Sequence, residues 1–152
     1  MISESEVLTV MRTHVRQGTY REAMNYADTL PLEVKNRPLV ALERSRALLR
    51  QGHPINAEAA LATANIVLAT PGEQLILAIE AAALRIYRYV ALDEAIKAAE
   101  VAFTKVENAH IDPADRAEAE RIYVRIILIA ATYHEISPEE GNNGRDRLPA
   151  IA

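Results

Sequence analysis

One short pattern occurs twice in the first half of the chain: Gly18-Thr19-Tyr20-Arg21-Glu22-Ala23 is followed, 34 residues further on, by Gly52-His53-Pro54-Ile55-Asn56-Ala57. A weaker third copy, Val90-Ala91-Leu92-Asp93-Glu94-Ala95, follows after another 38 residues. Each copy lies between two segments with helical periodicity. In the first two copies, glycine can end one helix and a capping residue or proline can begin the next. This period is typical of arrays of helix pairs, in which one pair alone cannot bury its apolar face.

The alanines of this pattern suit close packing between helices. Alanine accounts for 27 of the 152 residues, whereas aromatic residues make up 5% and Trp is absent from the sequence. This composition favours helices over sheets. Ala23, Ala57 and Ala95 hold the same place in the three copies, and we expect them where neighbouring backbones approach each other.

Start and stop signals divide the chain into seven predicted helices. Ser3 and Thr19 each precede a Glu by three residues, as in a capping box, and Gly18 and Gly52 stand where helices should end. Asp112 is a predicted N-cap before Pro113. The predicted helices are residues 4–17, 20–30, 38–51, 54–69, 73–89, 92–108 and 113–135.

The first copy extends to the pattern Gly-x-Tyr-x-x-Ala-x-x-x-Ala, formed by Gly18, Tyr20, Ala23 and Ala27. With the 34-residue step to the second copy, the chain resembles tetratricopeptide repeat proteins over about residues 4–109. The second copy lacks the Tyr, and the third lacks both the Gly and the Tyr. The resemblance implies an all-α fold: a right-handed α-solenoid of about three antiparallel helix pairs with a long C-terminal helix.

The predicted organisation is one helical-repeat domain followed by a tail. The repeats are about 4–37, 38–71 and 72–109, the terminal helix is 113–135, and the domain as a whole is 1–136. The residues after it, 137–152, are rich in Gly, Asn and Pro and are predicted to be a loop.

Composition, charge and motifs argue against several classes of function. A net charge of -4 without interleaved basic and aromatic residues is unfavourable for binding nucleic acid. The acidic N-terminus is unlike a signal sequence, and Glu80 and Arg125 interrupt the longest apolar runs, so we expect a soluble, cytoplasmic protein with no membrane contact. The chain has no Cys, no paired His and no phosphate-binding or nucleophile motif. We therefore expect no enzyme activity, no cofactor and no metal.

Arginines recur in step with the repeat. Arg12 and Arg16 are one turn apart, Arg46 and Arg50 follow after 34 residues, and Arg88 keeps the distance to the repeat alanine that Arg16 and Arg50 have. In the resembled family the first helix of each pair lines a concave groove, which implies a row of guanidinium groups for the carboxylates of an acidic peptide. The alternative is that these cations stabilise helix C-termini and pair with acids such as Glu43 or Glu22.

The last predicted helix is apolar on nearly every side in its second half. A helix of this kind should be covered all round, whereas a terminal repeat helix normally has a polar outer face. We therefore expect a homodimer partner to cover part of it. The predicted interface residues are Ile122, Val124, Ile126 and Ile129. The alternative is that further helices of a longer protein cover this surface.

The leading functional hypothesis is a non-enzymatic adaptor whose arginine-lined groove binds a peptide or segment of another protein. A second hypothesis is a small cytosolic chaperone similar to those of type III secretion, on the basis of size, acidity and helical repeats. A third is the regulatory N-terminal domain of a larger signalling protein.

Overall fold

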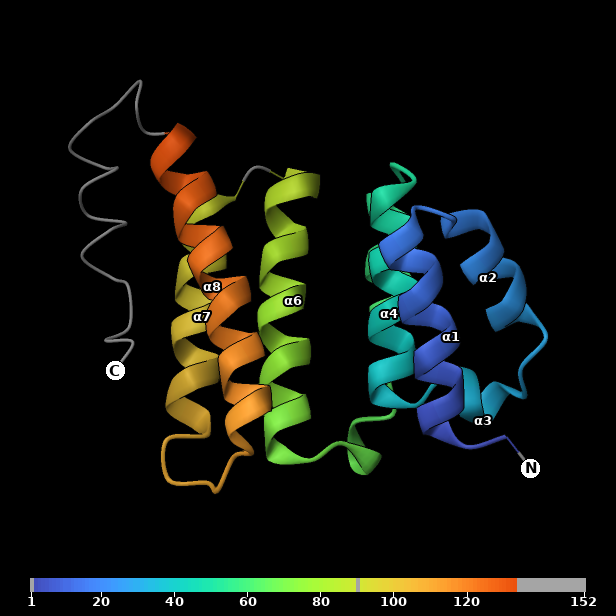
Figure 1. Cartoon of the computed structure of the whole chain (residues 1–152). Coiled ribbons are helices and arrows are strands. Elements are labelled where there is room, and N and C mark those ends of the chain that lie inside the picture. Colours follow the sequence, from blue (N-terminus) through green and yellow to red (C-terminus); the bar gives the residue numbers. More distant parts are fainter. Residues whose placement is uncertain (1, 90, 134–152) are drawn as a thin grey trace. The chain divides into compact units, whose positions relative to one another are not determined.

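A computed structural model describes residues 2–89 and 91–133, except the side chains of Arg88 and Tyr89. In these ranges the chain forms helices and no strand, so the predicted all-α class is confirmed (Figure 1). No helix among these residues is both apolar and long enough to span a membrane. The elements are α1 (Glu4–Gln17), α2 (Tyr20–Asp28), α3 (Leu32–Lys35), α4 (Pro38–Arg50), α5 (Pro54–Ala62), the 3-10 helix η1 (Ile66–Leu68), α6 (Pro71–Tyr89), α7 (Leu92–Lys105) and α8 (Pro113–Tyr133).

The chain forms two compact units, Met1–Leu77 and Ala78–Ala152, and the boundary between them falls within α6. The repeat pattern predicts one domain over residues 1–136, and the boundary between the two compact units falls inside the third predicted repeat. The predicted tail, residues 137–152, lies outside the described residues, as do the last two residues of the predicted terminal helix.

Several helix ends follow local sequence signals. Ser3 and Glu6 form the predicted capping box, in which each backbone N–H donates to the other side chain at 3.2 Å. Gly18 and Gly52 follow α1 and α4 with φ of 76° and 83°, in the left-handed region that glycine enters at little cost. The Asp112 carboxylate accepts the Ala114 N–H at 2.8 Å, as expected of an N-cap for α8.

The second predicted capping box, between Thr19 and Glu22, does not form. No side-chain hydrogen bond caps the start of α2. The Thr19 hydroxyl instead donates to the His14 carbonyl at 3.2 Å and lies 2.8 Å from His14 Nδ1. The hydroxyl therefore closes the turn between α1 and α2, because partners on the preceding helix compete successfully for it.

The second half of the predicted helix 54–69 is also different. In the structure α5 ends at Ala62, and the short η1 helix follows. The Asn65 N–H donates to the Asn36 carbonyl at 2.8 Å, so a contact distant in sequence turns the chain away from the helix axis. A short helix that the sequence did not predict, α3, follows Pro31 between α2 and α4.

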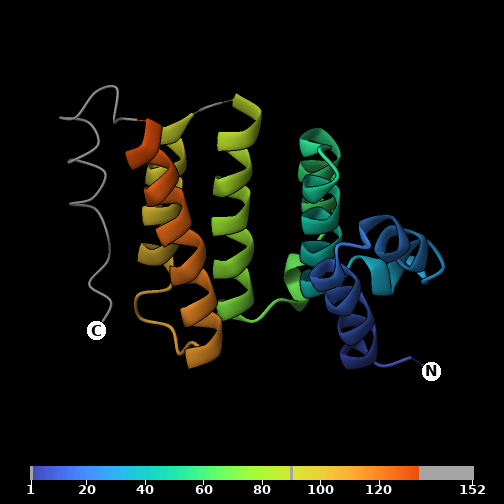
Figure 2. The same cartoon turned by 45° about the horizontal axis from the view of Figure 1, so that its top comes forward.

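The first unit is built from neighbouring helix pairs. Helices α1 and α2 pack together, α4 packs against both of them, and α5 packs against α4 (Figures 1 and 2). Ala23 of α2 and Ala57 of α5 are fully buried, which confirms their predicted role as packing residues. The core around α1, α2 and the start of α4 consists of Val7, Leu8, Met11, Ala23, Ala27, Leu30, Val34, Val40 and Ala47.

The second unit contains α7, α8 and most of α6. Ala95 of α7 is fully buried, as the repeat pattern predicts. The rings of Phe103 and Tyr123 join α7 to α8 edge to face, with centroids 5.5 Å apart. Glu80 of α6 pairs with Arg125 of α8. An aromatic pair therefore joins α7 to α8, and an ion pair joins α6 to α8.

Candidate functional site

Four of the five arginines predicted to bind a partner lie on two neighbouring helices of the first unit. Arg12 and Arg16 are in α1, whereas Arg46 and Arg50 are in α4. The two helices lie side by side, which brings the two halves of the predicted row together (Figures 1 and 2). Arg88 belongs to α6, and its side chain lies outside the described residues. We call Arg12, Arg16, Arg46 and Arg50 the arginine face.

A buried carboxylate joins the two halves of this face. Glu43 of α4 is only 3% exposed, and its Oε1 atom accepts hydrogen bonds from Arg12 Nε and Arg46 Nη1, each at 3.3 Å. A buried charge needs such partners, since an isolated carboxylate loses its hydration without compensation. The alternative weighed for these arginines was pairing with acids and stabilisation of helix C-termini. Pairing with Glu43 is present for Arg12 and Arg46, and Arg16 and Arg50 lie in the last turns of α1 and α4.

Arg16 and Arg50 lie differently. Both side chains are exposed, one turn beyond Arg12 and Arg46 on their helices. Arg16 Nε donates to the backbone carbonyl of Arg12 at 3.4 Å. Neither Arg16 nor Arg50 forms an ion pair with any residue that the structure describes. The outer part of the face is therefore open to anionic groups of another molecule.

The sequence did not single out Arg44, which lies on another side of α4. Its Nη1 atom donates to the Lys35 carbonyl at 3.2 Å and lies 3.3 Å from the Thr63 hydroxyl. Burial lowers the pKa of Arg44, and the nearby charge of Asp28 opposes this shift. Because its contacts run to the ends of α3 and α5, Arg44 has a structural role.

The second unit has its own buried carboxylate. Glu80 is 2% exposed, and its Oε2 atom lies 3.8 Å from Arg125 Nη2. These are the two charges that interrupt the longest apolar runs of the sequence. A single charge within an apolar run indicates that each residue needs a partner, but the sequence could not show that Glu80 and Arg125 are each other's partners.

The predicted dimer residues divide into two groups on α8. Ile122 and Ile126, one turn apart, are 1% and 0% exposed and are enclosed by their own chain. This burial follows from their position on the inward side of the helix, so they offer no surface to a second copy. Val124 and Ile129 are partly exposed, and Leu128 between them is 61% exposed.

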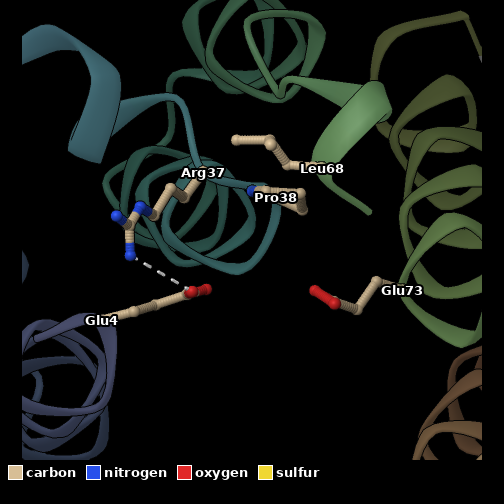
Figure 3. A pocket seen from close by; sticks show the side chains of 5 residues that line it. All are labelled: Glu4, Arg37, Pro38, Leu68 and Glu73. Carbon is tan, nitrogen blue, oxygen red and sulfur yellow. Dashed lines mark ion pairs between the residues drawn. The ribbon is translucent and has the colours of Figure 1, made fainter. Parts of the chain in front are cut away.

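A cleft of about 250 Å³ opens at the start of α4 in the first unit (Figure 3). Glu4 faces Arg37 there at 3.6 Å, and Glu73 exchanges capping hydrogen bonds of 3.2 and 3.4 Å with Thr70. Acids in the first turn of a helix stabilise its N-terminus, so these charges already have structural roles. The lining residues are Glu4, Arg37, Pro38, Leu68 and Glu73.

The described part of the chain has no group of three or more His, Asp or Glu side chains that could hold a metal ion. No protein-family model matches the chain, and no curated protein or solved structure matches it either. The arginine face is thus the strongest candidate site.

Proposed function

We propose that this protein is a non-enzymatic adaptor that binds an acidic segment of another protein on the arginine face. The main support is that Arg16 and Arg50 are exposed and form no ion pair within the described residues. In addition, buried Glu43 holds Arg12, one turn before Arg16 on α1. Guanidinium groups stay charged at all physiological pH values and match carboxylates with two parallel hydrogen bonds. The face therefore provides cations that its own unit does not neutralise.

The repeat supports the same proposal. Helices α1 and α4 begin the first two helix pairs, and the 34-residue step brings Arg16 and Arg50 to equivalent places on them. In the tetratricopeptide repeat proteins that the sequence resembles, these first helices line the binding groove. An acidic segment lying across α1 and α4 would meet both pairs of arginines.

The test uses a fluorescein-labelled octapeptide of alternating Glu and Ser and its Gln/Ser counterpart, measured by fluorescence anisotropy. We expect the acidic peptide to bind and the neutral one not to bind, with an affinity that falls as salt rises. The double substitution Arg16→Glu and Arg50→Glu should weaken binding about tenfold or more, because it replaces two attractions by two repulsions.

The matched control is Arg21→Glu with Arg85→Glu, which changes the net charge equally at two exposed arginines of α2 and α6. We expect this control to bind almost like the natural protein. Equal losses in both variants would mean that only net charge matters, and unchanged binding in the Arg16/Arg50 variant would contradict the proposal. Circular dichroism of both variants should show the natural helix content.

A further inference from the structure

The hydrogen bonds of Arg12 leave one end of its guanidinium group available. Arg12 donates to buried Glu43 through Nε, and its side chain is 48% exposed. Within the described residues, its two terminal Nη groups have no hydrogen-bond partner. Because the guanidinium group is planar, fixing Nε also fixes the direction of the terminal N–H groups. Glu43 therefore orients the terminal end of Arg12.

Arg16 is held in the same manner one turn later. Its Nε donates to the Arg12 carbonyl at 3.4 Å, and its side chain is exposed. Its terminal Nη groups likewise have no partner within residues 2–89 and 91–133. Two guanidinium groups on one helix thus share an arrangement: Nε is bound to the protein and the terminal pair of nitrogens remains for a ligand.

We infer that the partner segment carries two carboxylates, one bound end-on by Arg12 and one by Arg16, whose Cβ atoms lie roughly 5–6 Å apart because the two residues are four apart on a helix. An extended segment reaches this spacing at alternate residues, whose side chains lie on one side about 6.6–6.8 Å apart. The recognised pattern is then acid-x-acid, with each carboxylate taking two parallel hydrogen bonds. This inference rests on the proposed function, and it adds the spacing of the acids.

The test compares two peptides of identical composition, Ser-Glu-Ser-Glu-Ser and Ser-Glu-Glu-Ser-Ser, each titrated into the ¹⁵N-labelled full chain by NMR. In an extended peptide, adjacent glutamates point to opposite sides and cannot reach both arginines together. We expect Ser-Glu-Ser-Glu-Ser to bind about fivefold more tightly than Ser-Glu-Glu-Ser-Ser, because the second peptide loses one charged, hydrogen-bonded pair with an arginine.

The informative variant is Arg16→Lys, which keeps the charge but replaces the planar pair of donors by a point charge. It leaves the bond between Arg12 and Glu43 in place, and Arg21→Lys on α2 is its control. We expect the preference for the alternating peptide to fall below about twofold in Arg16→Lys and to persist in the control.

The outcomes distinguish failure of this inference alone from failure of the proposed function. If the natural protein binds both peptides equally, the spacing is not read and the inference is overturned, while the proposed function stands. If Arg16→Lys keeps the full preference, other residues read the spacing and the inference is again overturned. If neither peptide binds, the proposed function fails as well.

Discussion

Glu43 in the first unit and Glu80 in the second are both almost fully buried, and each contacts an arginine from a neighbouring helix. They differ in their surroundings. Glu43 holds two arginines at 3.3 Å, one of them half exposed, whereas Glu80 lies 3.8 Å from Arg125 of α8. The same kind of ion pair thus contributes to a cationic surface in one unit and connects α6 to α8 in the other.

This comparison indicates how a buried carboxylate can serve a surface site. A long arginine side chain on the surface has many rotamers, and ordering them costs free energy when a ligand binds. Glu43 fixes Arg12 before any partner arrives. In the second unit, Glu80 and Arg125 are better explained as a contact that fixes how α6 and α8 pack.

The largest expected effect comes from removing both cations that contact Glu43. Replacing Arg12 and Arg46 by Met keeps much of their apolar packing but leaves a buried carboxylate without these partners. We expect a loss of about 3–5 kcal/mol in the free energy of unfolding, measured by urea denaturation. Adding Glu43→Leu should restore most of this loss, since well-packed apolar residues often replace a buried ion pair without cost. If the variant with Met at positions 12 and 46 has the same free energy of unfolding as the natural protein, Glu43 needs neither arginine.

A smaller effect is expected for the ion pair of the second unit. Arg125→Met should lower the free energy of unfolding by about 1–3 kcal/mol, because it removes the charge that faces buried Glu80. The atoms are further apart than in the Glu43 cluster, so the loss should be less than that of the Arg12/Arg46 variant. A loss larger than that of the Arg12/Arg46 variant would mean that Glu80 depends on its arginine more than Glu43 does. The double variant Glu80→Met with Arg125→Met should recover stability.

The glycines after α1 and α4 allow the first unit to be destabilised selectively. At Gly18 and Gly52 a Cβ atom would meet nothing within 4 Å, but the positive φ angles strain any other residue. Each Gly→Ala substitution should therefore cost about 1 kcal/mol. In hydrogen exchange, we expect protection to fall in α1, α2 and α4 and to persist in α7 and α8. An equal fall in both sets of helices would contradict a division into two units.

The smallest effect is expected at the cleft. Glu4 and Arg37 are 3.6 Å apart, and their side chains are 35% and 38% exposed, so solvent and salt screen the pair. Glu4→Gln should change the free energy of unfolding by less than about 0.5 kcal/mol in urea denaturation. The difference should vanish in 1 M NaCl, where screening acts over only about 3 Å. A loss above 1 kcal/mol would give the cleft a larger role than a surface ion pair has.

The sequence predicted the features that depend on neighbours in the chain. Ser3 and Gly18 mark helix ends through local hydrogen bonds and backbone freedom, and the repeat alanines are buried as expected. The features it missed depend on residues outside the helix concerned. The end of α5 depends on the bond from Asn65 to distant Asn36, and the Thr19 hydroxyl bonds to His14 of the preceding helix and not to the start of its own helix.

The candidate site was predictable to the same extent. The sequence pointed to Arg12, Arg16, Arg46 and Arg50 as candidates, because these arginines recur with the 34-residue step of the helix pairs. It could not show that Arg12 and Arg46 meet at Glu43, since that contact joins residues 31 positions apart. The difference between fixed and exposed arginines is a property of packing, which no local pattern contains.

The most direct test of the arginine face is an NMR titration of the Nε–Hε signals in protein labelled with ¹⁵N-arginine. The chain has 14 arginines, so each group can be followed separately as the Ser-Glu-Ser-Glu-Ser peptide is added. We expect the signals of Arg12, Arg16 and Arg50 to shift first, while those of Arg21 and Arg85 stay in place. Shifts confined to arginines outside α1 and α4, or no shift at all, would show that the peptide does not bind the arginine face.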